Sequence, residues 1–295
     1  MKKYLVTGAS GNIGLQLVHD LQEKNFEVFP SYYSSKTPFK NSFYLDLKNE
    51  EEIKNIFSRI KPDVVFHLGA LTNVDFCESN QNEALTVNTN ATKIISELSE
   101  KCNSFLVYVS TDYVFDGIKG SFTEQDEPNP INYYGKSKLE GEKIIQNQNS
   151  KWCIARTSTP FGNFSSKKTF PNWVIQELKK NHQLNILEEQ FTSPTYIPNL
   201  SNMLIEISEK EINQITHTAD ASRISRYDLA IQISKKFDLD ESLINPITME
   251  NIDWHASRPK DSSLDVSLAT SLLDSKPLKI EESLDLFLNN FNSNC

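Results

Sequence analysis

A glycine-rich segment near the start of the chain constrains the fold more than any other feature. The sequence TGASGNIG (7–14) spaces Gly8, Gly11 and Gly14 three residues apart, between the apolar run 4–7 and a helical pattern of apolar residues over 13–21. In a strand–loop–helix unit, the first glycine permits a tight turn, the second lets the backbone approach a pyrophosphate, and the third allows the helix to pack closely on the strand. The N-terminus of the helix directs N–H groups and a partial positive charge at the phosphates. The loop therefore predicts a dinucleotide site, and the alternative is a purely structural turn.

Strand-like and helix-like segments then alternate along the first half of the chain. Predicted strands cover 4–7, 27–29, 43–45, 63–68, 105–109 and 152–155, and predicted helices cover 13–21, 50–60, 83–101 and 134–147. This alternation predicts an α/β fold with a Rossmann-type, doubly wound parallel sheet. Ligands of such a sheet bind beyond the carboxyl ends of its strands.

Strands and helices no longer alternate regularly after residue 158. We expect residues 1–158 to form an NAD(P)-binding Rossmann domain, joined by a returning segment near 190–212 that contains a helix over 199–209. Residues 159–189, with a helix over 171–181 and a strand over 184–187, and residues 213–295 are expected to form a smaller, discontinuous C-terminal substrate lobe.

Composition excludes several classes of function. The 295 residues contain 30 Lys+Arg and 39 Asp+Glu, a net charge of −9, which disfavours nucleic-acid binding because that depends on phosphate neutralisation by cations. No apolar run approaches the roughly 18 residues of a membrane span, and MKKYLVTG has no apolar core of a secretory signal. The four cysteines lack metal-binding spacing, so we expect free thiols in a cytoplasmic protein.

The residues after the second and third strands bear on the choice of cofactor. An Asp or Glu at the end of the second strand would bind the adenosine ribose and favour NAD. This chain instead has Ser34, Ser35 and Lys36, which favours NADP(H), with NAD(H) left open and a solvated loop as the alternative. Asp46, at the end of the third strand, is placed to accept a hydrogen bond from the adenine amino group or to start the next helix.

A tyrosine and a lysine carry the predicted chemistry. Tyr134 and Lys138 stand four residues apart, which places them on one face of a helix. A cation beside a phenol lowers its pKa, so Tyr134 can give a proton to a carbonyl oxygen as hydride reaches the carbon. The hydroxyls of Ser110 and Thr111, at the carboxyl end of strand 105–109, are placed to hold that oxygen. A surface Tyr–Lys pair is the alternative.

Three segments together resemble a known family. TGASGNIG, STDYVFDG (110–117) and YYGKSKLEGE (133–142) are similar to the extended short-chain dehydrogenase/reductases, and more narrowly to the dTDP-4-dehydrorhamnose reductase family. The resemblance implies NAD(P)H-dependent reduction of the 4-keto group of dTDP-4-dehydro-L-rhamnose to dTDP-L-rhamnose. Two alternatives stay open: another nucleotide-sugar reductase or epimerase, and a non-catalytic NADP-binding regulatory subunit similar to that of methionine adenosyltransferase.

The resemblance also implies roles for individual residues. The catalytic triad would be Thr111, Tyr134 and Lys138. Cofactor would contact, besides Tyr134 and Lys138, the residues Gly8, Ser10, Gly11, Asn12, Ile13, Asp46, Leu47, Gly69, Ala70 and Leu71. Nucleotide-sugar substrate would contact Val74, Thr111, Asp112, Tyr113, Tyr134 and Arg258. Some relatives bind Mg²⁺ through glutamates at a dimer interface, but those glutamates are not identifiable here, so we predict no metal and leave a homodimer open.

Other polar residues receive structural interpretations. We expect His67 to be a hydrogen-bonded structural histidine, Asp75 and Glu78 to cap a helix start rather than form a carboxylate pair, and Glu140 and Glu142 to form surface pairs with nearby lysines. The family's tryptophan after Arg-Thr-Ser is replaced by Thr159-Pro160-Phe161, with Phe161 either an apolar wall for the sugar or part of the core.

Overall fold

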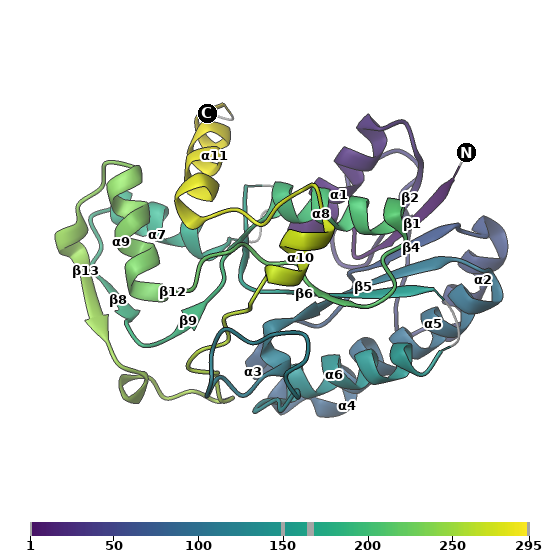
Figure 1. The fold of residues 1–295 in the computed structure, drawn as a ribbon, viewed down its shortest axis with the longest axis horizontal. Helices are drawn as coiled ribbons and strands as arrows, with labels where there is room; N and C mark the ends of the chain where they lie inside the picture. Colours follow the sequence, from purple (N-terminus) through teal and green to yellow (C-terminus); the bar gives the residue numbers. More distant parts are fainter. Residues whose placement is uncertain (1, 149–150, 164–167, 294–295) are drawn as a thin grey trace.

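A seven-stranded parallel sheet forms the centre of the computed structural model, which describes residues 2–148, 151–163 and 168–293 (Figure 1). The strand order is β11-β6-β5-β4-β1-β2-β3, so the chain reverses its direction across the sheet between β1 and β4. The strands are β1 (Lys3–Thr7), β2 (Glu27–Tyr32), β3 (Phe43–Tyr44), β4 (Val64–His67), β5 (Phe105–Thr111), β6 (Trp152–Thr157) and β11 (Ile215–His217). The predicted Rossmann-type fold class is confirmed.

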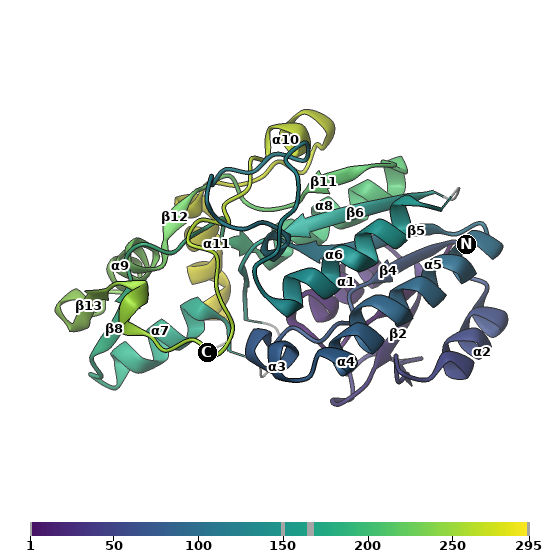
Figure 2. The same ribbon diagram turned by 90° about the horizontal axis from the view of Figure 1, so that it is seen from below.

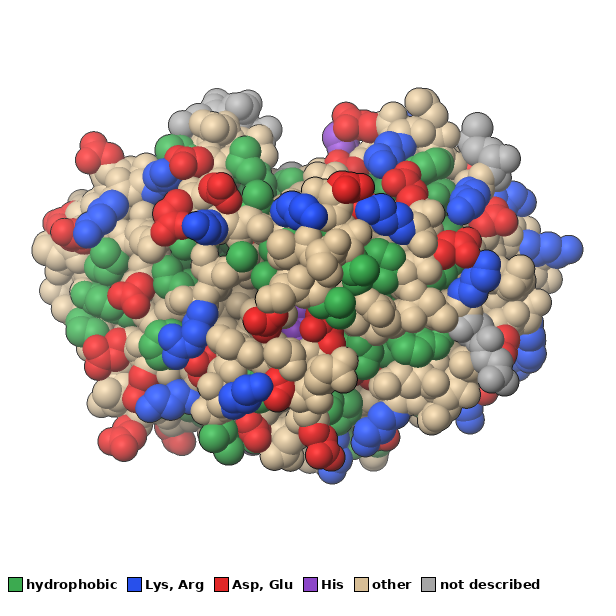
Figure 3. Space-filling model, viewed as in Figure 1, with side chains coloured by type: hydrophobic (Ala, Val, Ile, Leu, Met, Phe, Trp, Pro, Cys, Tyr) green, Lys and Arg blue, Asp and Glu red, His purple; other side chains and the backbone are tan. Residues whose placement is uncertain are grey.

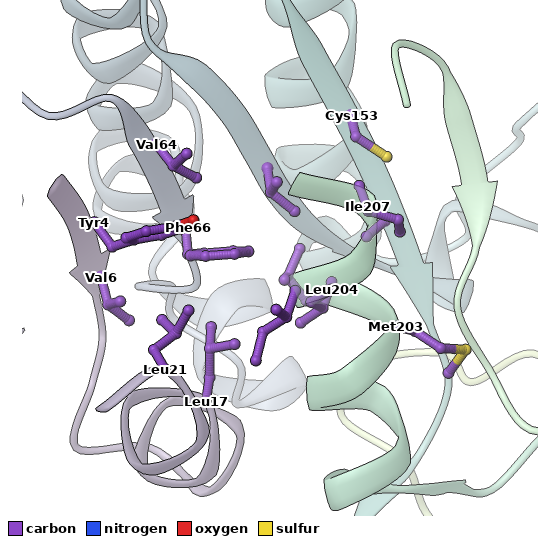
Figure 4. Packing of buried hydrophobic residues seen from close by; sticks show 14 of the residues in the cluster. Tyr4, Val6, Leu17, Leu21, Val64, Phe66, Cys153, Met203, Leu204 and Ile207 are labelled. Carbon is purple, nitrogen blue, oxygen red and sulfur yellow. The ribbon is translucent and has the colours of Figure 1, made fainter. Parts of the chain in front are cut away.

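Helices cover both faces of this sheet (Figures 1 and 2). One layer comprises α1 (Asn12–Glu23), α8 (Ile197–Lys210) and α10 (Ser267–Leu272). The other comprises α2 (Glu50–Ile60), α5 (Ala91–Lys101) and α6 (Tyr133–Gln146), with α3 (Val74–Ser79) and α4 (Gln81–Ala84) near its end. Alternate residues of β1 serve the two layers: Tyr4 and Val6 belong to the core cluster under α1 and α8 (Figure 4), whereas Leu5 belongs to the cluster under α2 and α5.

The predicted helix over 83–101 is interrupted by a wider turn. A π-helix, η1 (Leu85–Asn90), joins α4 to α5, and it contains the buried Asn88. The Asn88 side chain accepts a hydrogen bond from the Leu71 N–H at 2.8 Å and donates to the Ser137 hydroxyl at 3.0 Å. This turn therefore ties the loop after β4 to α6, as π-bulges at functional sites often do.

A second lobe lies beside the carboxyl ends of the strands and has its own core (Figure 1). Its helices are α7 (Phe170–Lys179), α9 (Arg226–Lys236) and α11 (Ile280–Ser293). Its strand pairs are β8 (Leu184–Leu187) with β13 (Ile244–Ile247), β7 (Pro160–Phe161) with β10 (Thr195–Tyr196), and β9 (Phe191–Thr192) with β12 (Ile224–Ser225). Short 3₁₀ turns, η2 (Asp112–Val114), η3 (Glu241–Leu243) and η4 (Met249–Asn251), complete the chain.

The chain returns to the first domain more often than the sequence predicted. The segment near 190–212 returns as α8, but β11 also pairs with β6 in the central sheet, and Ala269 of α10 packs into the core under α1. Residue 213 is therefore too early a start for the second part of the substrate lobe. Strand β11 spans only three residues, which are too few for hydrophobic periodicity to identify it.

The surface carries charges of both signs. Figure 3 shows acidic and basic side chains interspersed over one face of the molecule. None of the helices formed by the described residues combines the length and the apolar character that a bilayer span requires. Cys77, Cys102 and Cys153 are free thiols, and Cys295 lies outside the described residues.

Candidate functional site

A cavity of about 630 Å³ opens at the carboxyl ends of the central strands. Its volume lies in the usual range for small-molecule sites, and its position is where a doubly wound sheet binds ligands. The predicted site residues that line it are Gly8, Ser10, Gly11, Asn12, Ile13, Ser34, Asp46, Leu47, Gly69, Ala70, Leu71, Thr111, Asp112, Tyr134 and Lys138. Five predicted residues do not line it: Ser35, Lys36, Val74, Tyr113 and Arg258.

The three glycines of the first loop meet different steric demands. Gly8 has φ +69°, and a Cβ there would lie 2.8 Å from the backbone of Gly69. A Cβ on Gly14 would lie 2.5 Å from the Gly8 carbonyl oxygen, so the helix can approach β1 only without a side chain at this position. A Cβ on Gly11 would meet only the Gly8 carbonyl oxygen, at 3.4 Å, and would otherwise occupy the cavity. The space beside Gly11 is therefore kept for a ligand.

The N-terminus of α1 is open to an anion. Gly11 is its N-cap and supplies no side-chain acceptor, and no acidic residue lies in the first turn. The helix begins on the wall of the cavity, where its N-terminal N–H groups and partial positive charge favour a phosphate. The loop and the helix end together fit the pyrophosphate of a dinucleotide.

The end of β2 offers aromatic and hydroxyl groups to the cavity. Tyr33 and Ser34 line it, whereas Ser35 and Lys36 are exposed beside it. Sequence reasoning missed Lys48, which also lines the cavity, lies 5.8 Å from the centre of the Tyr33 ring and forms a 3.2 Å ion pair with Glu83. The position of Lys48 directly after Asp46-Leu47, at the end of the third strand, was the sequence feature that could have identified it.

The β3 end and the β4 end meet at one wall of the cavity. The carboxylate of Asp46 accepts a hydrogen bond from the Lys48 N–H at 2.9 Å, which fixes the turn before α2. A Cβ on Gly69 would lie 2.7 Å from Leu47 Cδ1, so the Leu47 side chain passes directly over the glycine. Behind this wall, His67 is buried between the hydroxyls of Thr7, at 2.7 Å, and Thr92, at 3.0 Å. These two contacts confirm the prediction of a hydrogen-bonded structural histidine, and burial lowers the pKa of His67 to about 3.

Helix α6 brings the predicted tyrosine to the end of β5. The helix begins after Asn132, whose side chain accepts a hydrogen bond from the Gly135 N–H at 2.9 Å. Tyr134, in the first turn, lines the cavity together with Thr111. Burial raises the pKa of Tyr134 above its usual range, and the nearby Thr111 hydroxyl acts in the opposite direction. The two hydroxyls thus meet on the wall of the cavity.

Lys138 occupies a place that the sequence did not predict. Its Nζ donates to the Val109 carbonyl oxygen at 2.9 Å and lies 3.9 Å from the centre of the Tyr108 ring. Burial lowers the pKa of Lys138 to about 7, while the nearby carboxylate of Glu142 raises it. The expected lowering of the Tyr134 pKa by Lys138 is not seen in this arrangement, because burial dominates the tyrosine and the lysine is held by the β5 backbone.

Glu142 does not form the surface pair that the sequence predicted for it. Glu140 does form the predicted surface pair, with Lys143 at 2.8 Å, but Glu142 is fully buried. Its carboxylate accepts hydrogen bonds from the Ser110 hydroxyl at 2.5 Å and from Arg156 Nη2 at 2.6 Å. The ion pair joins α6 to β6, and the hydrogen bond from Ser110, which lines the cavity, joins α6 to β5. Its partner Arg156 lies on β6, away from Glu142 in the sequence. The nearby lysines therefore suggested a surface ion pair instead.

Asp112 joins the two lobes at the same strand end. Its buried carboxylate accepts hydrogen bonds from the hydroxyls of Thr111 at 3.1 Å, Ser158 at 2.8 Å and Ser262 at 2.6 Å. Burial raises the pKa of Asp112, and the three hydroxyl bonds lower it. The side chain of the neighbouring Tyr113 makes an edge contact with Tyr134, with 6.1 Å between the ring centres.

The segment around α3 differs from its prediction. Asn73, not Asp75 or Glu78, caps this helix, by accepting a hydrogen bond from the Phe76 N–H. Asp75 instead binds Arg258 with two hydrogen bonds of 2.7 Å. Glu78 accepts from the N–H of Tyr133, the first residue of α6, and so supports a different helix start. Val74 begins α3.

The segment after β6 settles the role of Phe161. Phe161 is fully buried in the core of the second lobe, 5.7 Å from the ring of Tyr196, so it is a core residue. Thr159 has φ +43° and lines the cavity. It accepts a hydrogen bond from Arg226 Nη2 at 3.2 Å, a contact that the sequence did not suggest.

Among the described residues, one group of side chains could share a metal ion. His19, Asp20 and Glu23 of α1 place their ligand atoms within 4.8 Å of one another, and none of the three lines the cavity.

Comparison with known proteins places this geometry in a family. The dTDP-4-dehydrorhamnose reductase of Aggregatibacter actinomycetemcomitans is 32% identical over 280 residues, which cover 90% of this chain and 92% of the relative. The methionine adenosyltransferase 2 subunit beta of Xenopus tropicalis is 28% identical over 275 residues, with 90% and 81% covered. A crystal structure of dTDP-4-dehydrorhamnose reductase from Bacillus anthracis in complex with NADP has a TM-score of 0.89 and 27% identity, with 98% and 100% covered. The RmlD substrate binding domain family matches residues 1–293, and the chain therefore belongs to that family.

Proposed function

We propose that the protein reduces the 4-keto group of dTDP-4-dehydro-L-rhamnose to give dTDP-L-rhamnose. The observation that carries this proposal is that the side chains of Thr111 and Tyr134 line one cavity together with the glycine loop and the N-terminus of α1. A carbonyl reductase requires a hydrogen-bond donor, a proton donor and a dinucleotide site in one cavity. The named relatives in the family supply the substrate class.

Each residue of the triad has a separate task. When substrate binds, Thr111 turns its single hydroxyl proton from Asp112 to the carbonyl oxygen and holds that oxygen beside Tyr134. Tyr134 gives its phenolic proton to that oxygen as the carbon is reduced. Lys138, which the Val109 carbonyl oxygen holds in this structure, would stabilise the tyrosinate that remains once its ammonium turns toward Tyr134 in the loaded site. Asp112, bound to Thr111, keeps the threonine hydroxyl in position.

The cofactor that fits the cavity is a nicotinamide dinucleotide, which supplies the hydride when bound. Gly8, Gly11 and the N-terminus of α1 would hold its pyrophosphate, and Asp46 and Leu47 would lie beside its adenine. The region 31–36 contains no acidic residue to bind a free 2′-hydroxyl, which supports NADP(H). The bound NADP of the Bacillus anthracis relative supports the same choice.

The test follows NADPH absorbance after addition of dTDP-4-dehydro-L-rhamnose, generated in place by the two preceding enzymes of its synthesis. We expect oxidation by the wild type and a loss of turnover of at least about 10²-fold in Tyr134→Phe, with NADPH still bound. Tyr133→Phe is the matched control, because Tyr133 is the adjacent residue of α6 and does not line the cavity. Near wild-type turnover in Tyr134→Phe would remove the tyrosine from its role.

Two alternatives are separated by the same assay. Similarity to the methionine adenosyltransferase subunit over 90% of the chain motivates a non-catalytic, NADP-binding role. Tight NADPH binding without oxidation of any keto-sugar would favour it. A product with inverted configuration and no net NADPH consumption would favour an epimerase.

A further inference from the structure

Arg226 connects the second lobe to the substrate end of the cavity. It is the first residue of α9, and its backbone N–H donates to the Gln190 carbonyl oxygen at 3.0 Å. Its Nη2 donates to the hydroxyl of Thr159, which lines the cavity together with Thr111 and Asp112. The guanidinium therefore lies directly behind the wall that faces the reacting hydroxyls.

Among the described residues, this guanidinium lacks the carboxylate partner that three other arginines have. Arg156 binds Glu142, Arg223 binds Asp261 and Arg258 binds Asp75. Within residues 2–148, 151–163 and 168–293, Arg226 forms no ion pair, and its one side-chain hydrogen bond goes to a neutral hydroxyl. The one carboxylate that acts on its pKa, that of Asp112, already accepts three hydroxyl hydrogen bonds. The Arg226 guanidinium is therefore a half-buried cation that has N–H donors available for a ligand.

The position of Arg226 is fixed before a ligand arrives. Its guanidinium carbon lies 5.0 Å from the centre of the Phe170 ring, a distance typical of cation–π contact. The contacts with the Phe170 ring and the Thr159 hydroxyl together restrict the rotamers of a long side chain. Binding through this residue would therefore lose little conformational entropy.

We propose that Arg226 binds an oxyanion of the nucleotide-sugar substrate: a phosphate of the diphosphate or a carboxylate on the sugar. The inference rests on the proposed function only in taking the substrate to be a nucleotide sugar. A planar guanidinium with free N–H groups matches the paired oxygens of both groups. Arg258, the arginine that the sequence favoured for the diphosphate, already binds both carboxylate oxygens of Asp75, whereas Arg226 forms no ion pair with any described residue.

The experiment is calorimetric titration of the NADPH-saturated protein with dTDP, thymidine, UDP-glucose and UDP-glucuronate. Arg226→Met is compared with Arg226→Lys, which keeps the charge, and with Arg223→Met. Arg223 is the matched control because it is an arginine three residues earlier that stacks on Phe191 and pairs with Asp261. Unchanged melting temperature and NADPH affinity in Arg226→Met or in Arg226→Lys show that the variant is folded.

We expect Arg226→Met to weaken one class of ligand by about 10- to 100-fold, with partial recovery in Arg226→Lys. If the diphosphate is the anion, dTDP and both UDP-sugars weaken equally while thymidine does not change. If a sugar carboxylate is the anion, only UDP-glucuronate weakens. The proposal is overturned if no probe loses affinity, if thymidine loses as much as dTDP, or if the folded wild type binds none of the charged probes. Absence of reduction of dTDP-4-dehydro-L-rhamnose, with the arginine effect intact, would contradict the proposed function alone.

Discussion

The two ends of the cavity are built in opposite ways. At the β5–β6 end, the polar side chains of Asp112, Glu142 and Arg156 are buried and bound to neighbouring protein groups. At the β2–β3 end, Tyr33 and Tyr44 are 53% and 50% exposed, and the Lys48–Glu83 pair is open to solvent. Buried charge pairs are costly to break, whereas exposed ones contribute little. The proposed chemistry thus lies on the rigid end, and the proposed adenosine contacts lie on the adaptable one.

Glu142→Gln should produce the largest effect on stability. The variant leaves the buried charge of Arg156 without its partner, so we expect a loss of about 3–5 kcal/mol in the free energy of unfolding. Urea unfolding followed by circular dichroism measures it. Glu140→Gln is the control on the same helix, where the exposed pair with Lys143 should contribute less than about 1 kcal/mol. Equal losses in the two variants would remove the contrast between buried and exposed pairs.

The buried histidine behind the cavity gives an intermediate effect that depends on pH. Burial lowers the pKa of His67 to about 3, and the unfolded chain has its ordinary value near 6.5. Between these values the unfolded state binds the extra proton, so stability falls as the pH falls from about 6.5 toward 3. Lowering the pH from 6.5 to 5 should therefore reduce the free energy of unfolding by about 2 kcal/mol through this group.

Urea unfolding at pH 7, 6 and 5 tests this effect in the wild type and in His67→Asn. The wild type should lose more stability on acidification than the variant, because the variant lacks the group that titrates. Parallel pH curves for the two proteins would contradict the prediction, whatever their absolute stabilities.

The sequence predicted the glycine-loop end of the cavity correctly but misplaced Glu142 at the other end, for physical reasons. The Rossmann sheet and its helices follow from local periodicity, and the tight packing of Gly8 and Gly14 follows from their place between strand and helix. Glu142 was misassigned because a Glu-Gly-Glu stretch between lysines is a surface pattern unless a strand supplies a buried partner. That partner, Arg156, is in the next strand, and only the folded sheet brings it to α6.

Contacts across long sequence separations were beyond local patterns altogether. Thr159 and Arg226 are 67 residues apart, and Asp75 and Arg258 are 183 residues apart. The Asp75–Arg258 pair joins the two lobes, and the Thr159–Arg226 pair joins the segment after β6 to α9, so each depends on how the second lobe folds beside the strand ends. Neither spacing has a signature in one sequence.

The smallest effect is expected at the adaptable end, from Lys36→Ala. Lys36 is exposed beside Ser34, where the 2′-phosphate of NADPH would lie. One exposed cation contributes about 0.2–1 kcal/mol, so NADPH affinity should fall by no more than about fivefold and NADH affinity should not change. Fluorescence titration with both cofactors measures this, with Lys40→Ala, an exposed lysine four residues further on, as the control. Raising the salt concentration should reduce the difference further, because exposed charges are screened. Tighter binding of NADH than of NADPH by the wild type would contradict the cofactor assignment. A loss far above fivefold would instead mean that the loop closes over the phosphate and becomes as ordered as the opposite end.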